Sequence, residues 1–143
     1  YPVIENSQDF DRWRTHILSG EVNDGNAFHL FAGASSHAGL FSNAEDLLVY
    51  CDSLLNSQHF EYFTADGVDT DFHLGFMSWT DTYGACAARF YGHTGFTGVA
   101  LLVSPAHQSA MTMLTNRLHT DLEIIPTQAL LMPYIKEFHA KLH

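Results

Sequence analysis

The middle of the chain reads Tyr91-Gly92-His93-Thr94-Gly95-Phe96-Thr97-Gly98, and the apolar run Val99-Ala100-Leu101-Leu102-Val103 follows it. This pattern predicts two strands joined by a glycine-rich bend. Glycines beside a strand indicate that the backbone comes close to another group. The histidine and two threonines between them would suit a carboxylate or an oxyanion, because they supply hydroxyl, imidazole and exposed N–H donors. A glycine-rich bend without a ligand fits the same residues.

Changes in hydrophobic period place further strands and helices around this segment. The strands are expected over Phe72–Thr80, Ala88–His93, Val99–Val103 and Ala110–Thr115. The short Ser104-Pro105 turn makes the last two an antiparallel hairpin. The helices are expected over Ser7–Ser19, from the capping box at Ser42 to Asn56, and over Pro126–His143, where Pro133 should kink the helix or mark its start.

The stretches Gly20–Ser36 and Phe60–Asp71 are expected to be irregular, the first because Asn23-Asp24-Gly25-Asn26 is a turn signal. Helices around a run of antiparallel strands predict an α+β fold. We expect a sheet of three to four strands with flanking helices.

The chain has 143 residues, 46% of them hydrophobic, which is enough for one domain with its own core. We expect a single, partial domain over residues 1–143. No apolar run approaches the roughly 20 residues of a membrane span. The first six residues lack the features of a signal peptide, and the chain does not begin with Met. We interpret it as a piece of a longer protein.

The formal charge of −10 comes from 6 Lys and Arg against 16 Asp and Glu. Such a surface repels phosphate backbones, so we expect no nucleic-acid partner. Cys51 and Cys86 both lie in apolar patterns and are interpreted as small buried residues, with a disulfide between them left open. His139 and His143 have the spacing of a helical metal pair but no third ligand nearby, so we expect no metal and no cofactor.

Several of these stretches resemble a known family. Gly92 to Gly98, the Ser104-Pro105 turn and Met113-Leu114-Thr115-Asn116-Arg117 resemble the third motif and following hairpin of class C-like β-lactamases, penicillin-binding proteins and related esterases. The motif of that family reads Lys-Thr-Gly or His-Thr-Gly. Residues 20–27 and 36–47 resemble the segment ahead of the helix that enters the family's final sheet. The resemblance covers most of the chain, in order.

The resemblance implies an acyl-serine mechanism, in which a serine of a Ser-x-x-Lys motif attacks a carbonyl and a Tyr-x-Asn motif helps to move protons. The residues that it places at the substrate are His93, Thr94, Gly95, Phe96, Asn116 and Arg117. His93 would supply a charge or a hydrogen bond, and Thr94 would bind a carboxylate or carbonyl. The backbone N–H of Phe96 would form half of an oxyanion hole, and Asn116 and Arg117 would approach the substrate carboxylate.

Two family motifs are missing from this sequence. It contains no Ser-x-x-Lys, since its lysines are Lys136 and Lys141, and no Tyr-x-Asn. We therefore interpret the chain as the C-terminal part of a hydrolase of β-lactams, D-alanyl peptides or small esters, inactive by itself. The family's sheet also includes strands from the N-terminus. We expect an exposed sheet edge that binds the missing N-terminal half or a second copy.

Two other readings stay open. A chain that kept the substrate-facing wall without the nucleophile could be a non-catalytic module that binds a carboxylate ligand, or a purely structural one. Ser35 or Ser36 beside His37, or one of the two cysteines with a histidine, could form a nucleophile pair. No orienting acid is evident in the sequence for the serine–histidine pair.

Overall fold

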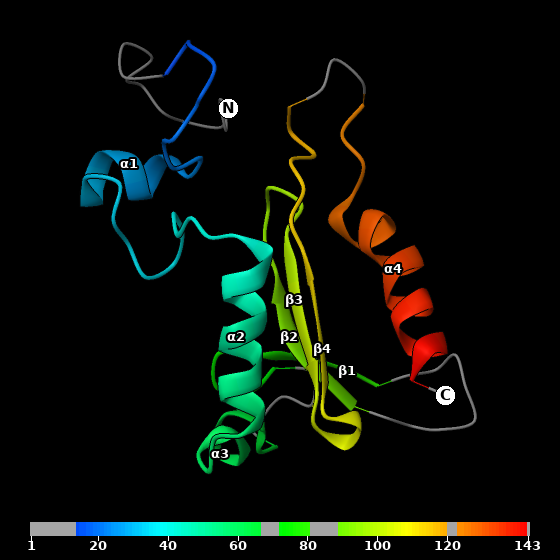
Figure 1. Cartoon of the computed structure of the whole chain (residues 1–143). Coiled ribbons are helices and arrows are strands. Elements are labelled where there is room, and N and C mark those ends of the chain that lie inside the picture. The colour runs from blue at the N-terminus through cyan, green and yellow to red at the C-terminus, as the bar shows by residue number, and fades with distance from the viewer. Residues whose placement is uncertain (1–13, 67–71, 81–88, 120–122, 143) are drawn as a thin grey trace. The chain divides into compact units, whose positions relative to one another are not determined.

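The computed structural model describes residues 14–66, 72–80, 89–119 and 123–142. The chain divides into two compact units, residues 1–41 and 42–143. The first unit carries the short helix α1, and the second carries the sheet and the helices packed on it (Figure 1). No helix in the described ranges is long and apolar enough to cross a membrane.

Helix α1 covers Gly25–Phe31. Its N-cap is Asp24, whose carboxylate accepts the backbone N–H of Ala27 at 2.7 Å, and this bond satisfies a donor that the first turn leaves free. The expectation of an irregular Gly20–Ser36 was therefore wrong, because the supposed turn signal is a helix cap. The helix expected over Ser7–Ser19 was wrong over residues 14–19, which are not helical; its earlier residues lie outside the described ranges.

The second unit is built on one antiparallel sheet in the order β1-β2-β3-β4. The strands cover Met77–Thr80, Arg89–Thr94, Ala100–Ser104 and Ser109–Met113. The short 3-10 helix Pro105–His107 joins β3 to β4, which pair as the predicted antiparallel hairpin. The first strand is shorter than predicted, since Phe72 makes only an isolated bridge to Met77. The α+β architecture predicted from the sequence is confirmed.

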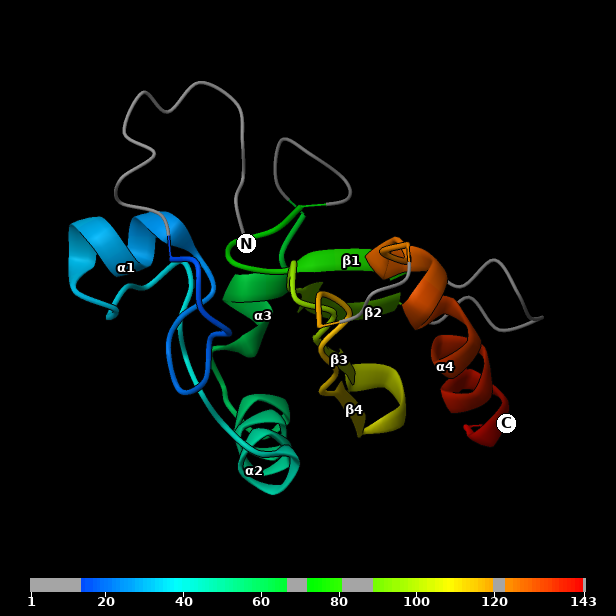
Figure 2. The ribbon, with the colours of Figure 1, turned by 90° about the horizontal axis from the view of Figure 1, so that it is seen from above.

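Helices cover both faces of this sheet (Figure 2). Helix α2 covers Ala44–Leu55 and α3 covers Phe60–Thr64. With them, Cys51, Phe60 and Val103 form a buried core on one face. Helix α4 covers Thr127–Lys141. Its Leu131 packs with Ala100 and Met113 on the other face. Strand β3 therefore contributes to both cores through alternate residues.

Two details of the helices differ from the sequence prediction, and the position of Pro133 excludes one of the two alternatives given for it. Asn43 rather than Ser42 caps α2, because its side chain accepts the backbone N–H of Asp46 at 2.8 Å. Helix α3 lies in the stretch expected to be irregular, and Phe60 at its start is buried. Pro133 lies inside α4 instead of starting it. The predicted end of α2 at Asn56 is confirmed. Cys51 is buried and free, while Cys86 lies outside the described ranges.

Gly92 allows β2 and β3 to come close together. A Cβ atom built there would lie 1.9 Å from the carbonyl oxygen of Leu101 and 3.0 Å from the Cα atom of Leu102. Both neighbours are backbone atoms, which cannot swing aside as a flexible side chain could. Any larger residue at this position must therefore push the two strands apart.

We predict that Gly92→Ala lowers the free energy of unfolding of the sheet unit by about 1–3 kcal/mol or more, the range known for overpacking. Denaturant unfolding followed by circular dichroism measures the change. Gly25→Ala is the matched control, because a Cβ there meets nothing within 4 Å. Equal stability of the two variants would contradict the close approach.

Candidate functional site

The loop between β2 and β3 carries the glycine-rich motif, and two backbone hydrogen bonds close it. Gly95 N–H donates to Val99 O at 2.8 Å, and Gly98 N–H donates to Gly95 O at 3.0 Å. Gly98 has a φ of +97°, a left-handed conformation that glycine adopts without steric cost. A turn followed by a left-handed glycine is the usual form of a three-residue hairpin loop. Phe96 at its tip is 56% exposed.

Among the residues that the structure describes, β1 covers only part of the edge of β2 that faces away from β3. Strand β1 pairs with Arg89 to Gly92, whereas β3 pairs as far as Thr94. Antiparallel strands turn their backbone groups to one neighbour and then to the other at successive residues. Because Gly95 N–H points to β3, the backbone N–H and C=O of Thr94 point to the opposite edge. That edge can accept an extended ligand as a further strand.

His93 lies exposed at this open edge. Its Nδ1 lies 2.8 Å from the carbonyl oxygen of Thr94. A carbonyl can only accept, so Nδ1 is the donor in this hydrogen bond. Thr94 is half-buried. Successive side chains of a strand alternate between faces, so the two side chains leave β2 in opposite directions.

Arg117 is bound to the same loop instead of standing free. Its Nε donates to Phe96 O at 2.7 Å, and its Nη1 donates to Ile125 O at 2.9 Å. Its guanidinium lies over the Phe96 ring, 4.8 Å from the ring centroid. Its backbone N–H donates to Thr97 O at 2.9 Å. The structure therefore brings Phe96 and Arg117 into direct contact.

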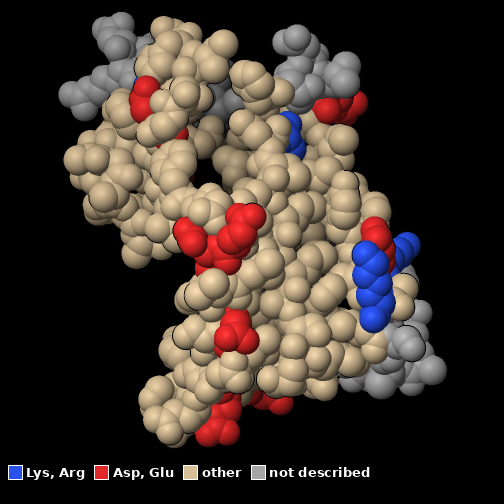
Figure 3. Space-filling view, viewed as in Figure 1, with Lys and Arg blue, Asp and Glu red and all other residues tan. Residues whose placement is uncertain are grey.

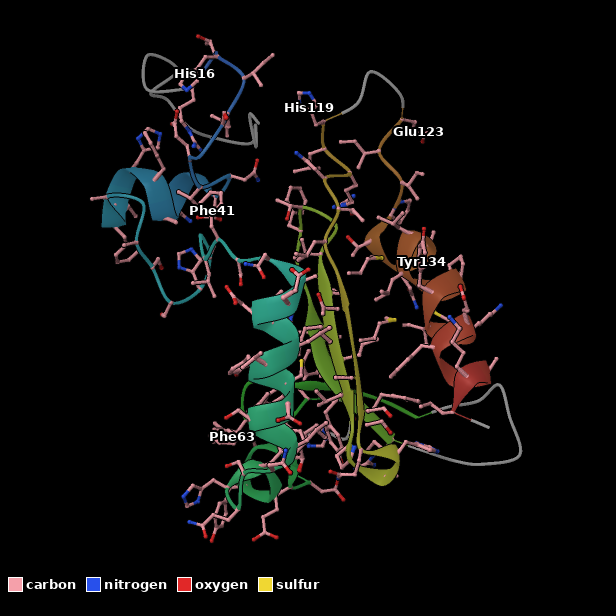
Figure 4. The ribbon with its side chains drawn as sticks, viewed as in Figure 1. His16, Phe41, Phe63, His119, Glu123 and Tyr134 are labelled. Atoms are coloured by element: carbon pink, nitrogen blue, oxygen red, sulfur yellow. The ribbon has the colours of Figure 1, made fainter. Side chains whose placement is uncertain are left out.

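Asn116 holds the turn beside this contact. Its side-chain oxygen accepts the backbone N–H of Leu118 at 3.2 Å, and the residue is exposed. His119 and Glu123 flank the stretch that follows, at the end of the sheet unit where the β2–β3 loop lies (Figure 4). Three segments meet there: the loop, the chain after β4 and the chain before α4.

Negative charge dominates the surface around these elements. Glu45 and Asp46 lie in the first turn of α2, and acidic side chains recur along the face drawn in Figure 3. With a formal charge of −10 for the whole chain, an anionic ligand is repelled at long range. A cation near the loop, such as Arg117, therefore matters for any carboxylate that binds there.

A second constellation lies in the first unit. The hydroxyl of Ser35 hydrogen-bonds Nδ1 of His37, and Nε2 of His37 lies 3.1 Å from Oδ1 of Asp24. The Ala27 N–H bond, followed by that from His37, holds the pKa of the Asp24 carboxyl below its usual value. Sequence reasoning missed Asp24 as an orienting acid. Asp24 lies 13 residues from His37, in a stretch that was predicted to be a turn.

None of these groups gathers into a metal site. Among the described residues, no three His, Cys, Asp or Glu side chains lie together in a way that could hold a metal ion. His143 and the side chain of His139 lie outside what the structure describes.

Comparison with known proteins gives the family. The profile of the family described as Beta-lactamase matches residues 3–131. The chain belongs to the beta-lactamase family. It is 37% identical over 131 residues to "N-acetylmuramyl-L-alanine amidase" of Bacillus subtilis (strain 168), covering 78% of this chain and 29% of that protein. It is 35% identical over 129 residues to "Putative D-alanyl-D-alanine carboxypeptidase" of Escherichia coli (strain K12), covering 78% and 30%.

The chain thus spans about 30% of the length of these curated relatives. No solved structure matches. The family and the names of these relatives support a function related to serine hydrolases. The resemblance noted in the sequence is therefore confirmed at the level of the family.

Proposed function

We propose that this chain supplies one wall of the acyl-transfer site of a serine hydrolase, formed by His93, Thr94, Gly95 and Phe96. The observation that carries the proposal is the open edge of β2, where pairing with β1 stops at Gly92 while pairing with β3 continues. A peptide-like substrate can lie along such an edge and present its carbonyl to the loop. The substrate class is an amide or ester: a β-lactam, a D-alanyl peptide or a small ester.

The wall would act on the transition state. A serine oxygen bonds to the substrate carbonyl carbon, its proton passes to a base of the segment that carries the serine, and the carbonyl oxygen becomes negatively charged. The N–H of Phe96 donates to no group among the described residues, so it can donate to that oxygen. Such a preorganised donor contributes about 2.7–4 kcal/mol to transition-state binding. The C–N or C–O bond then breaks, the leaving group takes a proton, and water hydrolyses the acyl-serine.

The nucleophile would come from outside this sequence. The sequence contains no Ser-x-x-Lys motif, and the relatives are about three times as long as the matched stretch. We propose that a longer protein carries that motif on another segment. By this reading, the chain alone binds substrate weakly and does not turn it over. Asn116 would line the same wall, because it is exposed beside the loop.

The same reasoning predicts a partner that pairs with the edge of the sheet. β4 is the last strand of the sheet, and no strand in the described ranges pairs with its outer edge. The hydroxyl of Thr112 in β4 is buried without a hydrogen-bond partner among the described groups. We propose that a strand from the rest of the longer protein covers this edge. Without it, an unpaired edge favours pairing with a second copy.

A second candidate function has an observation of its own. The bonds from Ser35 to His37 and from His37 to Asp24 link a possible nucleophile, base and orienting acid. The low pKa of Asp24 keeps its carboxylate charged at neutral pH. An ionised Asp24 favours the proton on Nε2 of His37, which leaves Nδ1 to accept the proton of Ser35.

The reaction would be hydrolysis of small activated esters. Ser35 Oγ bonds to the ester carbonyl carbon and its proton passes to Nδ1 of His37. The C–O bond to the leaving group breaks, and an activated leaving group departs as its anion. Water then attacks the acyl-serine, and the acid is released as Ser35 recovers a proton. This candidate requires activity from the chain alone, whereas the first candidate excludes it.

We expect the chain alone to leave a chromogenic cephalosporin and p-nitrophenyl acetate intact, and the longer protein with its Ser-x-x-Lys segment to hydrolyse at least one. Absorbance assays of both proteins measure this. Phe96→Pro, which removes the backbone N–H, should lower kcat by about 10²–10³-fold, with Phe96→Leu as the matched control. An inert longer protein of normal fold would overturn the proposed wall.

The second candidate predicts that the chain alone forms a single acetyl adduct with p-nitrophenyl acetate, lost in Ser35→Ala and retained in Ser36→Ala. Intact-mass spectrometry locates the adduct. Asp24→Asn keeps a good helix cap but loses the charge, so it should slow acylation while α1 stays folded. An adduct that persists in Ser35→Ala would refute this candidate.

For the partner, we predict that the chain alone contains dimers at micromolar concentration. Light scattering after size-exclusion chromatography measures the mass. Leu114→Lys, at the end of β4, should shift the chain toward monomer, since charges at sheet edges oppose pairing. Leu48→Lys on α2 is the matched control, because the two leucines are 43% and 44% exposed. An unchanged monomer in every variant would rule out self-pairing.

A further inference from the structure

We propose that Arg117 is a positioning residue, which fixes the Phe96 peptide at the edge of the wall, and that it does not bind the substrate carboxylate itself. This inference rests on the proposed function and reverses the role that resemblance gave to Arg117. It is carried by four contacts of one residue with one loop and its surroundings.

The first step concerns the donors of the guanidinium. A carboxylate is best bound by two parallel N–H groups on one edge of an arginine. In Arg117, Nε already donates to Phe96 O and Nη1 donates to Ile125 O. The guanidinium plane is also occupied on one side by the Phe96 ring. Binding a carboxylate through the edge that carries Nε would therefore break the bond to Phe96 O.

The second step concerns what these contacts fix. The N–H of Phe96 belongs to the peptide that follows Gly95, whose carbonyl oxygen accepts Gly98 N–H at 3.0 Å. The next peptide is held at its carbonyl oxygen by Arg117 Nε. Thr97 O accepts the backbone N–H of Arg117. Phe96 therefore lies between peptides that are each fixed by a hydrogen bond, which sets the direction of its N–H.

The third step concerns the surroundings of the contact. A Cβ on Gly98 would lie 3.1 Å from Arg117 Cβ and 2.6 Å from Thr115 Oγ1. The Thr115 hydroxyl donates to Gly98 O. Through Ile125 O, the same guanidinium also holds the chain that leads into α4. The loop is thus packed at Gly98 against Thr115 and the base of the Arg117 side chain.

A positioning role and a carboxylate-binding role predict different kinetics. Misdirecting the Phe96 N–H weakens binding of every transition state, whether or not the substrate carries a carboxylate. Loss of a carboxylate partner weakens binding of carboxylate-bearing substrates alone. Loss of a group that acts only in the transition state lowers kcat with little change in KM.

The test uses the longer protein that contains this chain, with a chromogenic cephalosporin, which carries a carboxylate, and p-nitrophenyl acetate, which does not. For Arg117→Lys, which keeps the positive charge but loses the planar guanidinium, we expect kcat to fall by a similar factor on both substrates, on the order of 10²-fold for a displacement near 1 Å, with KM little changed. Arg89→Lys is the matched control, because Arg89 pairs with Asp66 away from the loop. A rise in KM confined to the cephalosporin would overturn the inference.

A second measurement separates this inference from the proposed function. Amide hydrogen exchange of the chain alone reports on the Gly98 and Gly95 N–H groups, which close the loop. We expect Arg117→Gln to speed their exchange while amides of β3 stay protected. Unchanged exchange at both glycines would overturn the positioning role. If the wild-type longer protein hydrolyses neither substrate while exchange changes as expected, the proposed function fails and the loop contact stands.

Discussion

The close pairing of β2 with β3 is the constraint on which the rest of the sheet unit depends. Gly92 permits it, since a Cβ there would overlap the carbonyl oxygen of Leu101. β3 contributes a buried residue to each core, with Val103 toward α2 and Ala100 toward α4. A slip of one residue between the strands would exchange these faces. The pairing of β1 with β2, which stops at Gly92, decides where the open edge begins.

The loop at the end of this hairpin obtains its shape from contacts made far along the chain. Its own two hydrogen bonds close the turn, but Arg117 and Thr115 hold it from 17 to 21 residues away. Position 98 requires glycine for two reasons. Its φ is +97°, and a side chain there would overlap Thr115 and Arg117. A glycine-rich loop that would otherwise be mobile is thereby held in one conformation, which is what a hydrogen-bond donor in a catalytic wall needs.

Local periodicity was sufficient to predict the sheet and the helices α2 and α4, because each buries a face of regular spacing, as Leu131 and Val103 show. It failed at α1, where Asp24 caps a helix of seven residues that begins with glycine. It also failed for side-chain pairs distant in sequence, since no spacing rule links Arg117 to Phe96 or Asp24 to His37. The candidate loop and Arg117 were therefore named from the sequence, whereas the contact between them was not.

An arginine whose N–H groups are hydrogen-bonded to carbonyl oxygens still carries its positive charge. The carbonyls that bind Arg117 are neutral, so the guanidinium remains a cation beside the loop. In a chain with a formal charge of −10, that cation lowers the repulsion felt by a carboxylate within roughly 8 Å, the screening length at physiological salt. Attraction at this range needs no direct contact and weakens as salt is added. One side chain can thus hold the Phe96 peptide by short hydrogen bonds and draw an anionic substrate toward the edge of β2 by its field.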